Sequence, residues 1–162
     1  MLIEMKVAGL AIDPLTDMPI LLLRDLDDRR TIPIWIGLVE SSAIATELQH
    51  VELTRPMTHD LMRQMLVELG VTVLHVEITD LRDNTYYARL MLQQGSRIVQ
   101  LNARPSDAIA IAMRAGCSLF VEEKVLEKAS RFDLHSDAVS DLDASSDMLA
   151  SLPADYFGKW KM

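Results

Sequence analysis

Two short stretches of the chain combine residue types that could bind a phosphate and move a proton. Residues 55–60 read Arg-Pro-Met-Thr-His-Asp, and residues 104–107 read Arg-Pro-Ser-Asp. In each stretch, Arg-Pro precedes a hydroxyl residue and an aspartate at the start of a predicted helix. Proline keeps the chain before it extended. An arginine beside the free N–H groups of a helix start can bind an anion jointly with them.

The hydroxyl and the acid of each stretch also have a purely structural interpretation. Thr58 and Ser106 can accept hydrogen bonds as N-cap residues, and the aspartate that follows each of them complements the helix dipole. Capping does not account for Arg55 or Arg104, which could clamp a phosphate or pair with the nearby acid. The substrate-binding candidates are therefore Arg55, Arg104, Thr58 and Ser106.

His59 is the best candidate for a general acid or base, because it is the one histidine in the sequence beside both an arginine and an aspartate. Glu40 follows a glycine that permits close backbone approach. It could complement a helix dipole, or it could join two aspartates around a divalent cation such as Mg²⁺ or Mn²⁺. The carboxylates are scattered singly, so the metal ligands stay undefined. The catalytic candidates are His59, Asp60, Asp107 and Glu40.

Other signatures of catalysis are missing from the sequence. It contains no Gly-rich phosphate loop, no Gly-x-Ser-x-Gly, no His-Glu-x-x-His and no paired cysteines. Tyr86 and Tyr87 beside Arg89 could stack nucleic-acid bases. Cross-strand packing is the alternative, since neighbouring strand residues face opposite sides.

The periodicity of apolar residues predicts an α+β fold with mixed or antiparallel sheets and three main helices. Strands are predicted at 2–12, 19–24, 31–36, 71–79, 85–93, 97–103 and 119–121. Helices are predicted at 40–53, 58–69 and 106–116, followed by a turn or two at 122–129.

Two details of this order bear on the site. The apolar residues of the second helix predict an inward face made of Leu61, Met62, Met65, Leu66 and Leu69. At an offset of 65 residues, Ile-Trp-Ile-Gly at 34–37 aligns with Val-Gln-Leu-Asn at 99–102. A duplicated βββα unit would explain that alignment. The alternative is a chance similarity between residues that are common in helices and strands.

Composition divides the chain into a domain at 1–130 and an acidic, Ser/Ala-rich tail at 131–162. The net charge is −8, and residues 132–162 carry half of it, with six Asp and two Lys. The composition of the tail predicts a solvated linker that is followed by a short helix at 148–160. No apolar run is long enough to span a membrane. Together with the single cysteine Cys117 and the acidic N-terminus, this predicts a cytoplasmic protein.

Three ordered motifs resemble the bifunctional nuclease family, long catalogued as a domain of unknown function. They are Ile-Trp-Ile-Gly-Leu-Val-Glu-Ser-Ser-Ala-Ile at 34–44, the stretch at 55–61, and Asn-Ala-Arg-Pro-Ser-Asp-Ala-Ile-Ala at 102–110. The resemblance covers about residues 2–130, with Ser41 standing where a common variant has Ala. It implies an α+β domain that self-associates as a homo-oligomer and a nuclease that acts on DNA and RNA.

Two hypotheses follow for the function. The first is a nuclease in which the arginines clamp phosphate, His59 moves the proton and the carboxylates orient water or a cation. The second is a non-catalytic oligomeric module whose Arg-Pro helix starts hold an anionic ligand or a protein partner. The acidic charge offers nucleic acid no general attraction, so binding would depend on local basic groups.

Overall fold

The computed structural model describes residues 1–133, and these form seven strands and four helices. The order along the chain is β1 (Leu2–Ile12), β2 (Pro19–Asp25), β3 (Thr31–Trp35), α1 (Leu38–Leu48), α2 (Thr58–Glu68), β4 (Val71–Arg82), β5 (Thr85–Gln94), β6 (Arg97–Ala103), α3 (Pro105–Ala115), β7 (Ser118–Glu122) and α4 (Glu123–Asp133). The α+β prediction is confirmed. The predicted tail linker beyond Asp133 and the predicted helix at 148–160 lie outside the described residues.

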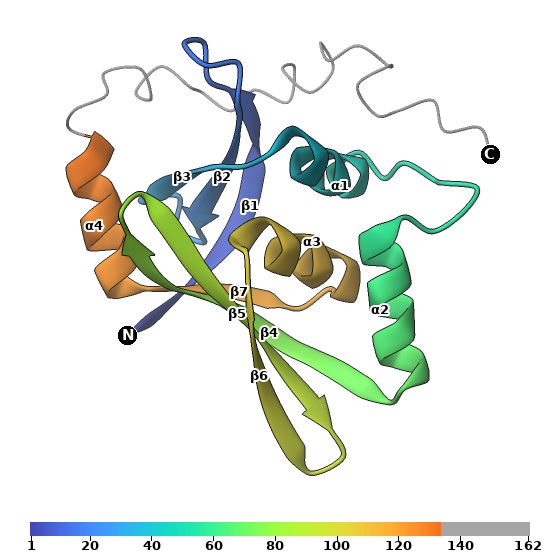
Figure 1. Ribbon diagram of the computed structural model, residues 1–162. Helices are drawn as coiled ribbons and strands as arrows, with labels where there is room; N and C mark the ends of the chain where they lie inside the picture. Colours follow the sequence, from blue (N-terminus) through green and yellow to red (C-terminus); the bar gives the residue numbers. More distant parts are fainter. Residues whose placement is uncertain (134–162) are drawn as a thin grey trace.

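All seven strands join one mixed sheet in the order β3-β2-β1-β7-β4-β5-β6 (Figure 1). Every neighbouring pair is antiparallel except β4 and β7, which run parallel. The β4–β5 hairpin turns through Asp83 and Asn84, both with positive φ, as a tight two-residue hairpin loop requires. Strand β7 lies between two three-stranded halves, and each half leads into a helix, α1 or α3. This arrangement fits a duplicated βββα unit, which stays a prediction.

Two helix ends differ from the sequence prediction. Helix α1 stops at Leu48 rather than 53, because the backbone of His50 turns left-handed with φ of 50°. Helix α4 is eleven residues long rather than a turn or two. It is held because Val125 is fully buried and Lys128 Nζ donates to Asp80 Oδ1 at 2.7 Å. The predicted tail from residue 131 therefore begins inside a helix.

The N-cap predictions for Thr58 and Ser106 are wrong. Helix α2 is capped by Met57 and α3 by Arg104, so both hydroxyl residues lie inside the first turn. Proline accounts for the shift in α3, because Pro105 suits the first helical position, where no N–H is needed.

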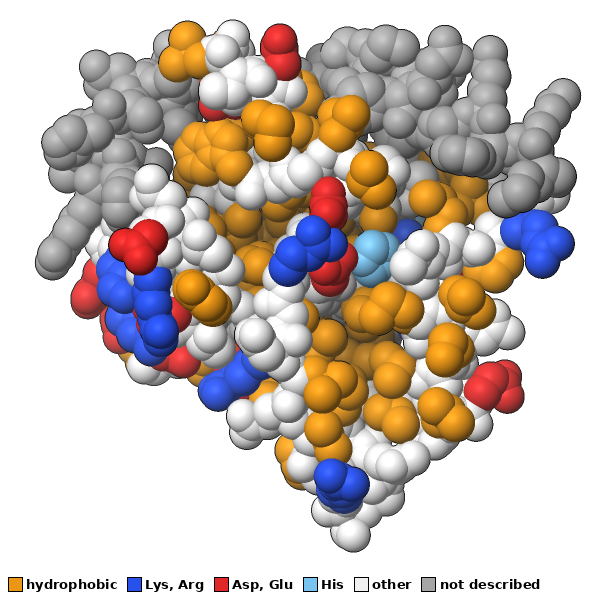
Figure 2. Space-filling view, viewed as in Figure 1, with side chains coloured by type: hydrophobic (Ala, Val, Ile, Leu, Met, Phe, Trp, Pro, Cys, Tyr) orange, Lys and Arg blue, Asp and Glu red, His pale blue; other side chains and the backbone are white. Residues whose placement is uncertain are grey.

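The predicted inward face of α2 is also wrong for four of its five residues. Leu66 packs against the core, whereas Leu61, Met62, Met65 and Leu69 are between 42% and 63% exposed. No residue of α2 is buried. Hydrophobic side chains accordingly gather over α2 and the neighbouring β5–β6 hairpin on the surface that Figure 2 shows.

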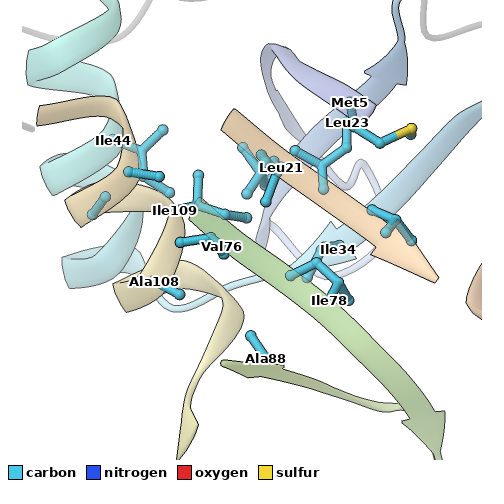
Figure 3. Close-up of a cluster of buried hydrophobic side chains, with 14 of the residues drawn as sticks. Met5, Leu21, Leu23, Ile34, Ile44, Val76, Ile78, Ala88, Ala108 and Ile109 are labelled. Carbon is cyan, nitrogen blue, oxygen red and sulfur yellow. The ribbon is translucent and has the colours of Figure 1, made fainter. Parts of the chain in front are cut away.

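The core fills the space between the sheet and helices α1, α3 and α4. Ile44 of α1 and Ile109 of α3 meet Leu21 of β2 and Val76 of β4, all with essentially no exposed surface (Figure 3). Helix α3 is the most enclosed, with seven buried residues along its eleven. It therefore provides a rigid base for whatever its N-terminus presents to solvent.

Candidate active site

The site begins where strand β6 ends and α3 starts. Arg104 is the last residue before the helix, in an extended conformation with φ of −68° and ψ of 144°. Asp107 lies in the first turn of the same helix. Arg104 Nε donates to Asp107 Oδ2 at 2.7 Å, so the two residues of the Arg-Pro-Ser-Asp motif are held together.

Two other helices bring their first turns to this pair. Arg104 Nη1 donates to Glu40 Oε1 of α1 at 2.6 Å. His59 Nε2 of α2 lies 3.0 Å from Asp107 Oδ1. We call Glu40, His59, Arg104 and Asp107 the Arg104 cluster. Four of the eight predicted site residues thus come together from three helices, as far as 67 positions apart in the sequence.

Gly37 lets Glu40 adopt its position. The glycine caps α1, and a Cβ atom there would overlap a carboxylate oxygen of Glu40. The sequence predicted that another group approaches the backbone of Gly37 closely, and that group is the Glu40 side chain. A larger residue at 37 would push this carboxylate away from Arg104.

The charges of the Arg104 cluster stabilise one another. Burial alone would raise the pKa of Asp107, but hydrogen bonds from Arg104 and His59 outweigh it, so the pKa lies below its usual value. The Asp107 and Glu40 carboxylates in turn raise the pKa of Arg104. The Arg104 side chain is 64% exposed, whereas that of His59 is only 13% exposed. The cluster thus presents a fixed guanidinium to solvent beside a shielded imidazole.

Asp60 and Arg55 lie apart from this cluster. Asp60 accepts from Arg114 Nε at 2.5 Å and from the Met57 backbone N–H at 2.9 Å, which turns it away from His59. Arg55 lines a hollow of about 270 Å³ together with Asp60, Arg114 and Glu47. In the single chain, Arg55 therefore lines a hollow to which no residue of the Arg104 cluster contributes.

Within residues 1–133, Glu40, Asp60 and Asp107 do not gather into the cation site that the sequence offered as an alternative to their helix-dipole role. Asp60 is paired with Arg114, while Glu40 and Asp107 both bind Arg104. No group of three His, Cys, Asp or Glu side chains in this part of the chain is arranged to hold a metal ion. The chemistry of the cluster is therefore argued from its own side chains.

A second cluster repeats the same residue types on the sheet. Glu77 of β4 accepts from Arg89 Nε of β5 at 2.6 Å, and its other oxygen lies 2.8 Å from His75 Nε2. Arg89 also reaches Gln100 of β6 at 3.5 Å. We call His75, Glu77, Arg89 and Gln100 the Glu77 cluster. The sequence signal for it was His75 and Glu77 two apart among the apolar residues at 73–78.

The sequence allowed Tyr86 and Tyr87 of strand β5 to stack nucleic-acid bases beside Arg89, but in the structure these residues have other partners. Arg89 is committed to Glu77, and it is Arg82 whose guanidinium lies 5.3 Å from the centre of the exposed Tyr87 ring. Tyr86 points the other way and donates through its hydroxyl to the Pro33 carbonyl of β3 at 3.0 Å. Tyr86 therefore has a packing role.

Residues 21–133 match the family model described as the bifunctional nuclease domain, and this span contains the whole Arg104 cluster. The chain belongs to the bifunctional nuclease domain family. Its predicted family membership is thereby confirmed.

Members similar to this bifunctional nuclease domain occur in bacteria and plants. An uncharacterized protein of Mycobacterium tuberculosis is 44% identical over 126 residues, which are 78% of this chain and 75% of that protein. Bifunctional nuclease 1 of Oryza sativa subsp. japonica is 28% identical over 97 residues, covering 58% of this chain and 29% of the rice protein. Bifunctional nuclease 1 of Arabidopsis thaliana is 30% identical over 86 residues, covering 51% and 26%. The aligned region is thus less than a third of each plant protein.

Proposed function

We propose that this chain is a nuclease that hydrolyses phosphodiester bonds in DNA, RNA or both at the Arg104 cluster. The observation that carries the proposal is the meeting of Glu40, His59, Arg104 and Asp107 from three helices within hydrogen-bonding distance. Family membership and the plant relatives named nucleases support it.

His59 is the proton-transferring residue in this proposal. Its Nε2 lies against Asp107 Oδ1, so the carboxylate holds the ring orientation and leaves Nδ1 as the atom that can accept a proton. Water attacks phosphorus and Nδ1 takes its proton. The phosphorus–oxygen bond to the leaving sugar then breaks, and that oxygen takes a proton from solvent. General base catalysis of this kind contributes about 10²–10⁴-fold.

Arg104 would bind the phosphoryl oxygens. Two of its nitrogens are occupied by Asp107 and Glu40, which fix the guanidinium plane in advance of binding. The side chain is 64% exposed, so the guanidinium stays accessible to a phosphate group. A preorganised donor aimed at developing negative charge is a major source of transition-state stabilisation.

The rival function is a binding module without catalysis. It is favoured by the fact that Arg104 already has two carboxylate partners, which makes the cluster net negative when His59 is neutral. Such a cluster would serve as a structural link between three helix starts. Self-association and nucleic-acid binding are compatible with either function, and so is the predicted cytoplasmic location.

Cleavage assays separate the two functions. The full chain is incubated with single-stranded DNA, double-stranded DNA and RNA, each with Mg²⁺, Mn²⁺ or EDTA. We expect cleavage by the wild type and its loss in the His59→Ala, Asp107→Ala double variant. Because the metal ligands are undefined, the EDTA lane also tests whether the reaction needs a divalent cation.

The control is His75→Ala in the Glu77 cluster, which removes a histidine bonded to a carboxylate on strand β4 rather than at a helix start. This variant should retain cleavage. Equal cleavage by the wild type and a folded double variant would point to a contaminating nuclease and would contradict the assignment of these residues.

A further inference from the structure

The exposed apolar side chains of α2 continue onto strand β6. Leu61, Met62 and Met65 of α2 and Leu69 at its C-cap are accompanied by Leu101 of β6, which is 46% exposed. Val99 lies beside Leu101 on the same face, since these residues pair with the buried Leu92 and Leu90 of β5. We call Leu61, Met62, Met65, Leu69, Val99 and Leu101 the α2–β6 surface (Figure 2).

Contacts at both ends hold α2 alongside the β5–β6 hairpin. At the helix start, His59 is bonded to Asp107, just after the end of β6. At the helix end, Gln94 Nε2 at the hairpin donates to the Leu69 carbonyl at 3.1 Å. The α2–β6 surface is therefore one fixed face, although its two elements are separated by strands β4 and β5 in the sequence (Figure 1).

We infer that the α2–β6 surface is where two copies of this chain pair. The amphipathic pattern of α2 is that of a helix with a buried stripe, yet in one chain only Leu66 of that stripe packs against the core. A second copy bearing the same face supplies the missing cover. Paired by two-fold symmetry, an apolar face contacts its own equivalent.

The size of the surface suits a stable dimer. Its six side chains expose roughly 600 Å², at the upper end of the apolar patches that monomeric proteins carry. With a polar rim, two copies bury about 1,600 Å² in total, the standard size for a specific protein–protein interface.

The charge pattern favours a second copy over nucleic acid or lipid. None of the six side chains is charged, so the surface needs no opposite charge on its partner. Nucleic acid would require Lys or Arg to neutralise phosphates, and a lipid surface attracts apolar faces fringed with such residues. Two acidic chains repel each other least where their contact face carries no charge.

Pairing here brings the partner to the edge of the Arg104 cluster. His59 precedes Leu61 by two residues, and Leu101 precedes Arg104 by three. A second copy on the α2–β6 surface therefore walls one side of a site that is open in the single chain. This consequence for catalysis, unlike the pairing itself, rests on the proposed function.

Sedimentation velocity of the full chain over a concentration series tests the pairing. We expect a monomer–dimer equilibrium in the wild type and a dissociation constant raised at least about 30-fold in Met65→Asp, because a charge is then buried at the centre of the contact. Met65 is 53% exposed, so the variant should fold, which circular dichroism checks. Leu101→Asp, on the β6 side, should act in the same direction.

The matched control is Leu15→Asp, which places the same charge at an 85% exposed leucine in the β1–β2 connection. It should leave the dissociation constant unchanged. A wild type that stays monomeric up to about 1 mM, or a dimer that neither Met65→Asp nor Leu101→Asp weakens, would overturn the inference.

Cleavage measured on the same samples separates the two proposals. If the wild type cleaves, its activity per chain should fall on dilution below the dissociation constant. A dimer that shows no cleavage removes the proposed function and leaves the pairing intact. Cleavage that stays constant per chain while the dimer dissociates removes only the link between pairing and catalysis.

Discussion

The Arg104 cluster and the Glu77 cluster are built from the same three side-chain types but placed differently. In each, a carboxylate lies between a histidine Nε2 and an arginine Nε, at distances of 2.6–3.0 Å. The Glu77 carboxylate is only 6% exposed and its partners lie on the same or the adjacent strand. The Arg104 cluster joins three helix starts and leaves its arginine exposed.

This difference separates a structural cluster from a candidate site. In the Glu77 cluster, register alone brings Glu77 opposite Arg89, and the contacts hold neighbouring strands together. In the Arg104 cluster, three independent elements must be positioned before any contact forms, and the guanidinium still faces solvent. We therefore expect the Glu77 cluster to matter for folding and the Arg104 cluster for chemistry.

The largest difference should appear when each histidine is removed. His59→Ala should lower the cleavage rate constant by about 10²–10⁴-fold, because it removes the proposed general base. His75→Ala should change it by less than about threefold, the histidine there being bonded only within the sheet. Single-turnover cleavage at saturating enzyme measures both. Equal loss in the two variants would mean that the clusters do not differ in the way we argue.

The arginines give the next largest difference. Arg104→Lys should lower cleavage about 10–100-fold, because an ammonium group cannot reproduce the planar fork that contacts two carboxylates and phosphate together. Arg89→Lys should leave cleavage nearly unchanged and lower the thermal midpoint instead. Rate and midpoint are measured on the same preparations. Should Arg104→Lys keep full activity, Arg104 does not bind the reacting phosphate.

The two clusters also differ in how far sequence could predict them. Arg104, Asp107, His59 and Glu40 stood at predicted helix starts, so the residue types and the glycine at 37 identified the candidates. The sequence could not say that Asp60 would turn to Arg114, because that choice depends on how α2 packs beside α3. Local spacing fixes a helix start, whereas pairing across 54 positions is set by tertiary packing.

The same limit explains the largest error in the fold. The pattern of Leu61, Met65 and Leu69 identified an apolar helix face correctly, but periodicity does not tell whether the core of the same chain covers that face. The strands were predicted to within three residues at each end, because alternation and turn residues are local signals. Helix α1 ends earlier than predicted because the backbone of His50 is left-handed, and nothing in the residue type of a histidine requires that conformation.

For folding stability, in contrast to cleavage, substitutions in the Glu77 cluster should have larger effects than substitutions in the Arg104 cluster. Glu77→Gln should lower the free energy of unfolding by about 1–3 kcal/mol, because it leaves a largely buried contact to Arg89 and His75 without its charge. Asp107→Asn should cost less than about 1 kcal/mol, since its arginine partner is mostly exposed and screened by solvent. Urea unfolding at pH 7 measures both. A larger loss for Asp107→Asn would make the Arg104 cluster the structural one.

The smallest effect concerns the pH dependence of that stability. Burial would raise the pKa of Asp107, yet Arg104 and His59 hold it below its usual value; in Glu77 burial is likewise outweighed by His75 and Arg89. A carboxylate with a lowered pKa in the folded state takes up its proton first in the unfolded state. Its contribution is therefore complete well above the unfolded pKa of about 4 and is lost as the pH falls through the folded pKa.

The stability gap between the wild type and Asp107→Asn should thus shrink as the pH falls from about 5 towards about 3.5. The gap for Glu77→Gln should shrink over the same range from a larger starting value, because its carboxylate is more enclosed. Urea unfolding in buffers of matched ionic strength follows both gaps. A gap for Asp107→Asn that widens as the pH falls from about 5 to about 3.5 would reverse the sign argued here and show that Asp107 is stabilised in its protonated form.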